Sequence, residues 1–125
     1  MIDITNTTSV SHPKTIPYQD IKDTVLGTGY ELSVVFCGQH LIRRLNRETR
    51  GKDYATDVLS FPLSEQSGEL FVCRDICERR AREHERDIEN YIAMLFVHGL
   101  VHLKGYDHGD TMDRLERRYR KQFSI

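Results

Sequence analysis

The chain has 125 residues, of which 30% are charged and 38% apolar, and its formal net charge at pH 7 is −1. This length and composition fit a single globular domain over residues 1–125 with a core of its own. The longest apolar run, residues 91–97, is too short to cross a bilayer, and the first ten residues lack a secretory signal pattern. An odd number of cysteines, three, argues against a disulfide framework, so we expect free thiols and a cytoplasmic protein.

In the first half of the chain, apolar spacing and turn residues predict elements in the following order. A short strand at residues 2–4 precedes a helix that follows Pro17 and ends at Gly27 or Gly29. A strand at residues 31–37, rich in β-branched and aromatic residues, is followed by a helix around residues 41–45.

In the second half, a strand at residues 57–61 is expected to stop at Pro62. A polar turn at residues 64–68 leads into another strand at 69–73. Three helices are predicted to follow, at about residues 75–85, 88–103 and 111–122. Strands and helices do not alternate strictly, so we predict an α+β fold in which a mixed four-stranded sheet packs with about five helices.

Three histidines lie in the segment H-G-L-V-H-L-K-G-Y-D-H, residues 98–108. His98 and His102 are four residues apart, so on a helix their rings leave the same face, separated by roughly 6 Å along the axis. Gly105 allows the chain to turn out of the helix, which brings His108 back toward the pair. Three imidazoles that leave a fourth position open are typical of a catalytic zinc site. The sequence predicts one divalent metal ion, with zinc expected, at the end of this central helix.

The same spacing occurs in zinc peptidases whose helix reads H-E-x-x-H-x-x-G-x-x-H. In those enzymes the Glu after the first histidine is the general base. Here that position is Gly99. The predicted site therefore lacks the proton acceptor that peptide hydrolysis requires.

The histidine segment resembles the H-G-x-L-H-L-x-G-Y-D-H signature of the YbeY family of bacterial rRNA maturation factors. Residues 45–62, L-N-R-E-T-R-G-K-D-Y-A-T-D-V-L-S-F-P, are similar to the family's L-N-x-x-Y-R-x-x-D-x-P-T-D-V-L-S-F-P. Residues 68–73, G-E-L-F-V-C, resemble the family's G-D-I-x-I strand. The chain departs from these patterns at Thr49, Ala55 and Val101, where the family has Tyr, Pro and Leu.

Members of this family are metal-dependent, single-strand-specific endoribonucleases. The resemblance implies that His98, His102 and His108 hold the metal and that Arg50 acts in the cleft. A guanidinium suits that place because it can hold phosphate oxygens through two charge-assisted hydrogen bonds. Asp107 is a second candidate catalytic residue. It could orient a histidine, accept a proton from metal-bound water, or only stabilise its own loop.

Three residues of the second block, Asp57, Ser60 and Phe61, are candidates for supporting the metal site or lining the cleft. Asp57 could support a metal ligand or only satisfy nearby amide groups. Phe61 could stack on a base, although a Phe in such a strand belongs more often to the core.

Arginine makes up thirteen of the eighteen basic residues. The planar guanidinium matches phosphate in a bidentate way. The basic residues of the last helix could contact rRNA or a ribosomal protein, or could simply complement the dipole at the helix C-terminus. They are Arg114, Arg117, Arg118, Arg120 and Lys121.

The resemblance predicts a metal-dependent endoribonuclease, a hydrolase of phosphodiester bonds. It would act on single-stranded RNA in rRNA processing and ribosome quality control, in contact with the ribosome or a ribosomal protein. Two alternatives stay open at this point. One is a non-catalytic ribosome-assembly factor with a structural metal, and the other is a metallohydrolase of peptides or small molecules.

Overall fold

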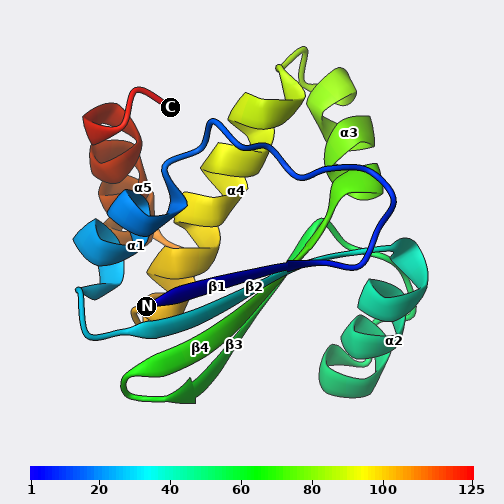
Figure 1. Cartoon of the computed structure of the whole chain (residues 1–125), viewed down its shortest axis with the longest axis horizontal. Helices are drawn as coiled ribbons and strands as arrows, with labels where there is room; N and C mark the ends of the chain where they lie inside the picture. The colour runs from blue at the N-terminus through cyan, green and yellow to red at the C-terminus, as the bar shows by residue number, and fades with distance from the viewer.

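Five helices and one four-stranded sheet make up the fold, which confirms the predicted α+β class (Figure 1). The structure, a computed structural model, describes all residues from Met1 to Ile125. The elements in chain order are β1 (Ile2–Asn6), α1 (Tyr18–Leu26), β2 (Glu31–Cys37), α2 (Gln39–Arg50), β3 (Val58–Ser64), β4 (Ser67–Cys73), α3 (Arg74–Glu83), α4 (Ile88–Leu103) and α5 (Asp110–Gln122).

The strands are arranged in the order β1-β2-β4-β3. β1, β2 and β4 run parallel, while β3 pairs antiparallel with β4. Parallel neighbours need a crossover connection, and α1 supplies it between β1 and β2. The antiparallel pair is joined by a tight turn at residues 65–66. β3 is the last strand in the order and pairs with β4 alone, so it lies at the edge of the sheet.

The prediction that Pro62 stops the third strand is wrong. β3 continues through Pro62 to Ser64, and β4 begins at Ser67, two residues earlier than predicted. Proline lacks the N–H that a central strand would use in pairing. β3 tolerates it because this strand has a neighbour on one side only.

Side chains of the sheet alternate between two faces, as the pleat of a strand requires. Val34 and Val72 point into the main core, which α1 and α4 cover. Val35 and Phe71 point the other way, into a smaller apolar cluster with Ile42 of α2. α2 therefore lies on the opposite face of the sheet from α4 (Figure 1).

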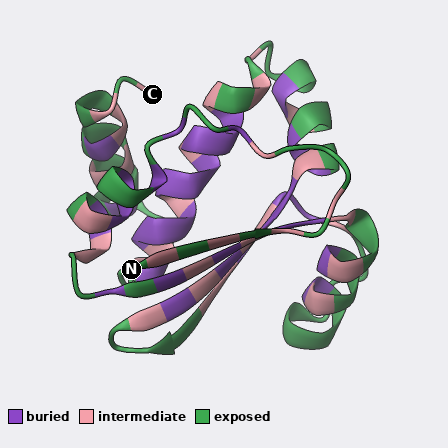
Figure 2. Ribbon diagram, viewed as in Figure 1, coloured by how far each residue is buried: buried purple, intermediate pink, exposed green.

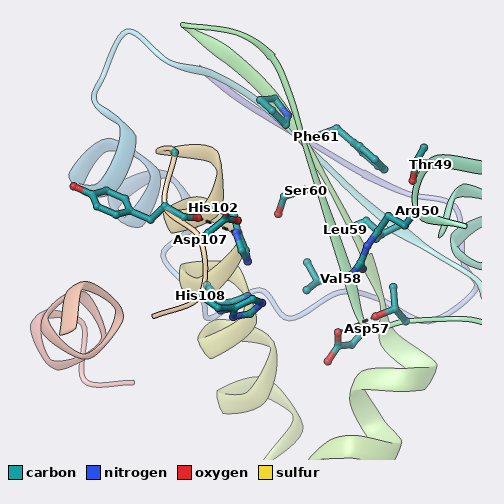
Figure 3. Close-up of a pocket in the computed structure, with 15 residues that line it drawn as sticks. Thr49, Arg50, Asp57, Val58, Leu59, Ser60, Phe61, His102, Asp107 and His108 are labelled. Carbon is teal, nitrogen blue, oxygen red and sulfur yellow. Dashed lines mark hydrogen bonds between the residues drawn. The ribbon is translucent and has the colours of Figure 1, made fainter. Parts of the chain in front are cut away.

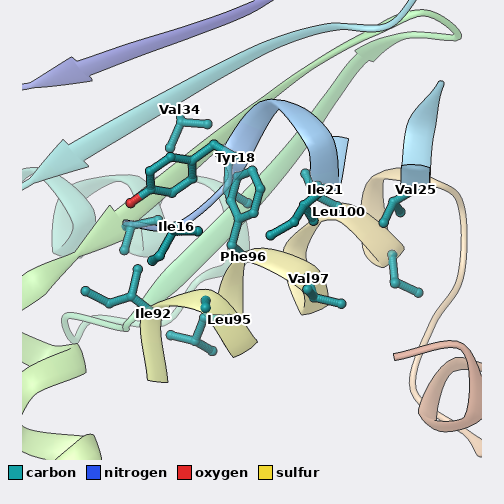
Figure 4. Close-up of a cluster of buried hydrophobic side chains, with 14 of the residues drawn as sticks. Ile16, Tyr18, Ile21, Val25, Val34, Ile92, Leu95, Phe96, Val97 and Leu100 are labelled. Atoms are coloured by element: carbon teal, nitrogen blue, oxygen red, sulfur yellow. The ribbon is translucent and has the colours of Figure 1, made fainter. Parts of the chain in front are cut away.

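The main core is centred on α4, the most continuously buried helix (Figure 2). Its Phe96 ring meets Tyr18 of α1 edge-on, with centroids 5.1 Å apart (Figure 4). Ile21 and Val25 of α1 pack beside them, as the spacing of that helix predicts. The side of α4 that faces away from this cluster carries the histidines.

All three cysteines, Cys37, Cys73 and Cys77, are buried and free. Burial raises the pKa of the Cys37 thiol to about 12 and also raises that of Cys77. These thiols are therefore protonated at neutral pH and pack as small apolar side chains. No helix has the length and apolar character needed to span a membrane.

Candidate metal centre and cleft

The helix that carries His98 and His102 begins and ends at specific residues. Asp87 caps its N-terminus, where the carboxylate accepts a hydrogen bond from the Asn90 amide at 3.2 Å. At the other end the Gly105 amide donates to the His102 carbonyl, with Gly105 at φ +109°. This left-handed residue reverses the chain after the last turn, as the sequence predicts.

The reversal brings His108 to the histidine pair. One ring nitrogen of each of the three histidines lies within 4.8 Å of the others. The imidazole ring centroids are 4.7 Å apart for His98 and His102, and 5.3 Å apart for His102 and His108. Three imidazole nitrogens that converge in this way form a donor set suited to one divalent ion.

Hydrogen bonds fix which nitrogen of two rings is free. Nδ1 of His98 bonds to Oε1 of Glu116 on α5, and Nδ1 of His102 lies 3.0 Å from the Tyr106 carbonyl. Because carboxylate and carbonyl oxygens only accept, each Nδ1 carries the proton. In the neutral form of each ring, the lone pair is therefore on Nε2. Metal-bound histidines usually show this arrangement, with an acceptor behind the ring.

His102 is also held in the protonation state that a metal requires. Burial lowers its pKa, and the neighbouring His98 lowers it further. A neutral imidazole is the form that coordinates a metal ion. The donor set, the hydrogen bonds and the charge state therefore all fit a bound divalent cation.

Gly99 has a packing reason that the sequence alone does not reveal. A Cβ atom at this position would lie 2.4 Å from Cδ1 of Leu70 and 3.2 Å from Oγ of Ser60. Leu70 is fully buried on β4, so it has little room to move. A side chain at this position would therefore require Leu70 or the helix to shift, and the Glu that a peptidase would need would require a larger shift than alanine.

The histidines form one wall of a cleft of about 690 Å³ that runs past the edge strand β3 (Figure 3). Arg50, the last residue of α2, lies in the opposite wall together with Thr49. α4 and α2 sit on different faces of the sheet, so the cleft wraps around the edge of β3. The structure therefore brings Arg50 and the three histidines into one cleft, although Arg50 and His98 are 48 positions apart in the sequence.

The other candidate residues also line this cleft. The Ser60 hydroxyl donates to the Gly99 carbonyl at 3.3 Å, which ties β3 to α4 beside the first histidine. Phe61 is half-buried and meets Phe71 edge-on, with ring centroids 5.8 Å apart. Its ring therefore belongs partly to the smaller apolar cluster and partly to the cleft.

The two aspartates occupy different surroundings. Asp57 is buried, and its carboxylate accepts a hydrogen bond from the Tyr91 hydroxyl at 3.0 Å rather than one from a histidine. Asp107 is exposed and lines the cleft between Tyr106 and His108. His98 and His102 both have other partners at Nδ1, so Asp107 orients neither of them.

Glu116 is a site residue that sequence reasoning misses. It lies on the packing face of α5 with Met112, Leu115 and Tyr119, a spacing of i, i+3, i+4 and i+7. A carboxylate among apolar residues on such a face needs a polar partner, and this is the signal that the sequence offers. The side chain of Glu116 is only 17% exposed, in keeping with this position.

The family comparison gives an independent result. A sequence model of the family described as "Endoribonuclease YbeY" matches residues 6–124. The chain belongs to the YbeY family. The YbeY match covers the cleft, all three histidines and both helices that frame them.

Individual relatives agree with the YbeY assignment. "Endoribonuclease YbeY" of Anaeromyxobacter sp. (strain Fw109-5) is 46% identical over 89 residues, covering 66% of this chain and 46% of the relative. The protein of the same name from Thermotoga neapolitana is 36% identical over 91 residues, covering 72% of this chain and 61% of the relative. The chain therefore spans between about half and three-fifths of the length of these YbeY relatives.

A solved structure shares the fold. The solution structure of TM1509 from Thermotoga maritima is similar with a TM-score of 0.66 and 26% sequence identity. The similarity covers 99% of this chain and 92% of that chain. The α+β arrangement found here for a YbeY sequence therefore has an experimental counterpart.

Proposed function

We propose that this protein is a metal-dependent endoribonuclease that cuts single-stranded RNA. We further propose that it acts on rRNA during ribosome maturation and quality control. One observation carries the proposal: a single cleft holds a three-imidazole donor set in one wall and Arg50 in the other. The name of the relatives, "Endoribonuclease YbeY", supports the same activity.

The residues that would hold the metal are His98, His102 and His108. A divalent ion bound there supplies a Lewis acid and lowers the pKa of coordinated water. Three imidazoles suit zinc, nickel and copper, and we propose zinc. Metal analysis of the purified protein tests this assignment, and a stoichiometric ion other than zinc would replace it.

Arg50 would bind the scissile phosphate from the opposite wall. Phosphoryl transfer increases the negative charge on the non-bridging oxygens, and a guanidinium stabilises that charge through paired hydrogen bonds. Asn46 supports this placement, because its side-chain amide donates to the Tyr54 carbonyl at 2.9 Å and so ties the loop after α2 back onto the helix.

Asp107 is the group proposed to accept a proton. It is exposed to solvent in the cleft, beside His108 and free of the Nδ1 hydrogen bonds of the other two histidines. A proton taken from water leads to hydrolysis with linear phosphate ends. A proton taken from the ribose 2′-hydroxyl leads instead to a cyclic phosphate and leaves DNA uncut. Analysis of the product ends separates these two reactions.

The deciding experiment compares the wild type with His98→Ala and Arg50→Ala on single-stranded RNA, duplex RNA and casein. We expect cleavage of single-stranded RNA alone, with a loss of roughly 10²- to 10³-fold in each variant. Arg44→Ala is the matched control, because Arg44 is an exposed arginine of the same helix outside the cleft.

Three results would contradict the proposal. Full ribonuclease activity in both His98→Ala and Arg50→Ala would mean that another protein causes the cleavage. Cleavage of casein would indicate a peptidase. Ribosome binding by an inactive wild type with bound metal would indicate an assembly factor whose metal is structural.

A further inference from the structure

The helix that ends in the cleft carries an unusual concentration of positive charge. Residues 39–53 contain five basic side chains and two acidic ones, a net charge of +3 in a chain whose formal charge is −1. The basic residues are Arg43, Arg44, Arg47, Arg50 and Lys52. Helix α2 therefore forms a local positive surface on an otherwise slightly acidic molecule.

Three of these arginines form one stripe. Positions 43, 47 and 50 fall within an arc of about 60° on a helix and span roughly 10 Å along its axis. Arg50 lies at the cleft, and the stripe leads from it toward the N-terminal end of α2. Ile42 and Asn46 face the sheet, so the stripe borders the buried side of the helix and remains open to solvent.

Arg43 and Arg47, the two arginines of the stripe that lie farther from the cleft, share a single acidic partner. Arg43 approaches Asp53 with Nε 2.9 Å from Oδ1 and Nη2 3.3 Å from Oδ2, and Arg47 lies 3.6 Å from the same carboxylate. All three side chains are more than half exposed, at 54%, 53% and 54% for Arg43, Arg47 and Asp53. One carboxylate cannot neutralise two guanidinium groups, and exposed ion pairs of this kind are weak and exchangeable. Asp53 thus neutralises only part of the charge of the two arginines and leaves an excess of positive charge on the stripe.

We infer that Arg43 and Arg47 form a phosphate-binding track that continues from the cleft along α2. Its ligand is the backbone of the single-stranded RNA whose scissile phosphate lies at Arg50. The inference rests on the proposed function, which it extends from the cleft to the neighbouring surface. The length of the stripe matches about three nucleotides at the rise of a stacked strand.

The phosphate-binding track predicts that substrate length matters. A short RNA can occupy only the cleft, whereas a longer one reaches Arg43 and Arg47 as well. Contacts of this type bind phosphate without reading sequence, so the gain should not depend on which bases are present. It should also weaken as salt is added, because each phosphate contact releases condensed counterions.

The test measures binding by fluorescence anisotropy with RNAs of about two nucleotides, which hold a single bridging phosphate, and about twelve nucleotides. All RNA-binding measurements use proteins that also carry His98→Ala, so that the RNA should stay intact. Single-stranded DNA of equal length is a second probe, and it is measured on proteins that keep His98. Arg43→Ala/Arg47→Ala should bind the long RNA about tenfold more weakly and the short RNA equally well. The slope of log affinity against log salt should fall by about 1.4, because each of the two phosphates that is no longer neutralised accounts for about 0.7.

Two further variants sharpen the test. Asp53→Asn removes the only acidic partner of the stripe, so it should bind the long RNA several-fold more tightly than the parent chain. Arg79→Ala/Arg82→Ala removes two exposed arginines from α3 and is the matched control for charge, with little change expected.

Unchanged binding of the long RNA by Arg43→Ala/Arg47→Ala would overturn the inference. An equal loss in the α3 control would also overturn it, because the effect would then follow from overall charge. A different result would show that the proposed function is wrong. In that case the wild type cuts no RNA, and this outcome is separate from whether binding depends on RNA length, Arg43 and Arg47.

Discussion

His98 of α4 and Glu116 of α5 are joined by a hydrogen bond between the imidazole Nδ1 and the carboxylate Oε1. The two residues are 18 positions apart, and the loop between them carries His108. The same contact therefore orients His98, one candidate metal ligand. It also anchors α5, the helix that follows the loop carrying His108. α5 is thus part of the candidate metal centre and not only a cover for the core.

Loss of the Glu116 carboxylate is expected to weaken metal binding. Glu116→Ala should lower the affinity for zinc by about 10- to 100-fold, because the ring of His98 would lose its acceptor and its fixed orientation. Competition against a chromophoric chelator measures this directly, without any assay of activity. Asp113→Asn, an exposed position on the same helix, is the control, and equal zinc affinity in Glu116→Ala and the wild type would contradict the expectation.

Gly99→Ala is expected to destabilise the fold. The added methyl group would overlap Leu70, and overpacking of a core usually costs about 1–3 kcal/mol. Alanine regains about 1 kcal/mol of helix propensity over glycine, so the net loss in the free energy of unfolding should be about 0–2 kcal/mol. Urea denaturation measures it, and a variant more stable than the wild type would mean that α4 can move away from the sheet at little cost.

The Tyr91 phenol should make stability fall at alkaline pH. Burial raises its pKa above the ordinary value of 10.0, and the Asp57 carboxylate raises it further. Above pH 10 the unfolded chain therefore loses a proton that the folded chain retains, so the free energy of unfolding decreases as pH rises. In Tyr91→Phe this decrease should be shallower by up to about 1.4 kcal/mol per pH unit.

The control for that measurement is Tyr54→Phe, since Tyr54 is 50% exposed. Unfolding in urea at several pH values between about 9 and 12, on either side of the ordinary tyrosine pKa, gives the two slopes. Parallel curves for Tyr91→Phe and the wild type would show that this phenol does not contribute to the alkaline loss.

Lys22 should be among the most stabilising charged residues. Its side chain is fully buried, and its ammonium group donates to the carbonyls of Gly27 and Tyr30 at 3.2 and 3.0 Å and pairs with Asp23 at 2.7 Å. Lys22→Met keeps the stem but leaves the carbonyls without a donor, so the free energy of unfolding should fall by about 2–4 kcal/mol. Lys121→Met, at an exposed position, should change it little.

The features that the sequence predicts well are those that depend on local spacing. His98 and His102 share a helix face because four residues make about one turn, and Gly105 ends that helix because it can adopt a positive φ. The presence of Arg50 in the same cleft is also predicted, although from the resemblance of its sequence block to a family and not from spacing.

The features that the sequence does not predict depend on contacts between distant segments. Glu116 and Lys22 are polar residues on buried faces, and their partners come from other elements or from turns whose shape a sequence does not specify. Pro62 predicts a strand end because proline lacks the backbone N–H that pairs one strand with the next. β3 nevertheless continues through Pro62 because β3 is an edge strand, and the sequence does not reveal the strand order.

The position of β3 also bears on how the protein would fail on heating. The two walls of the cleft belong to opposite faces of the sheet, and β3 runs between them with only β4 as a neighbour. A strand held on one side opens at lower free energy than the centre of the sheet. Brief detachment of β3 would remove the strand that lines the cleft between Arg50 and the histidines, while the α1–α4 core stayed intact. On heating, the ribonuclease activity proposed for the cleft should therefore be lost at a lower temperature than that of global unfolding.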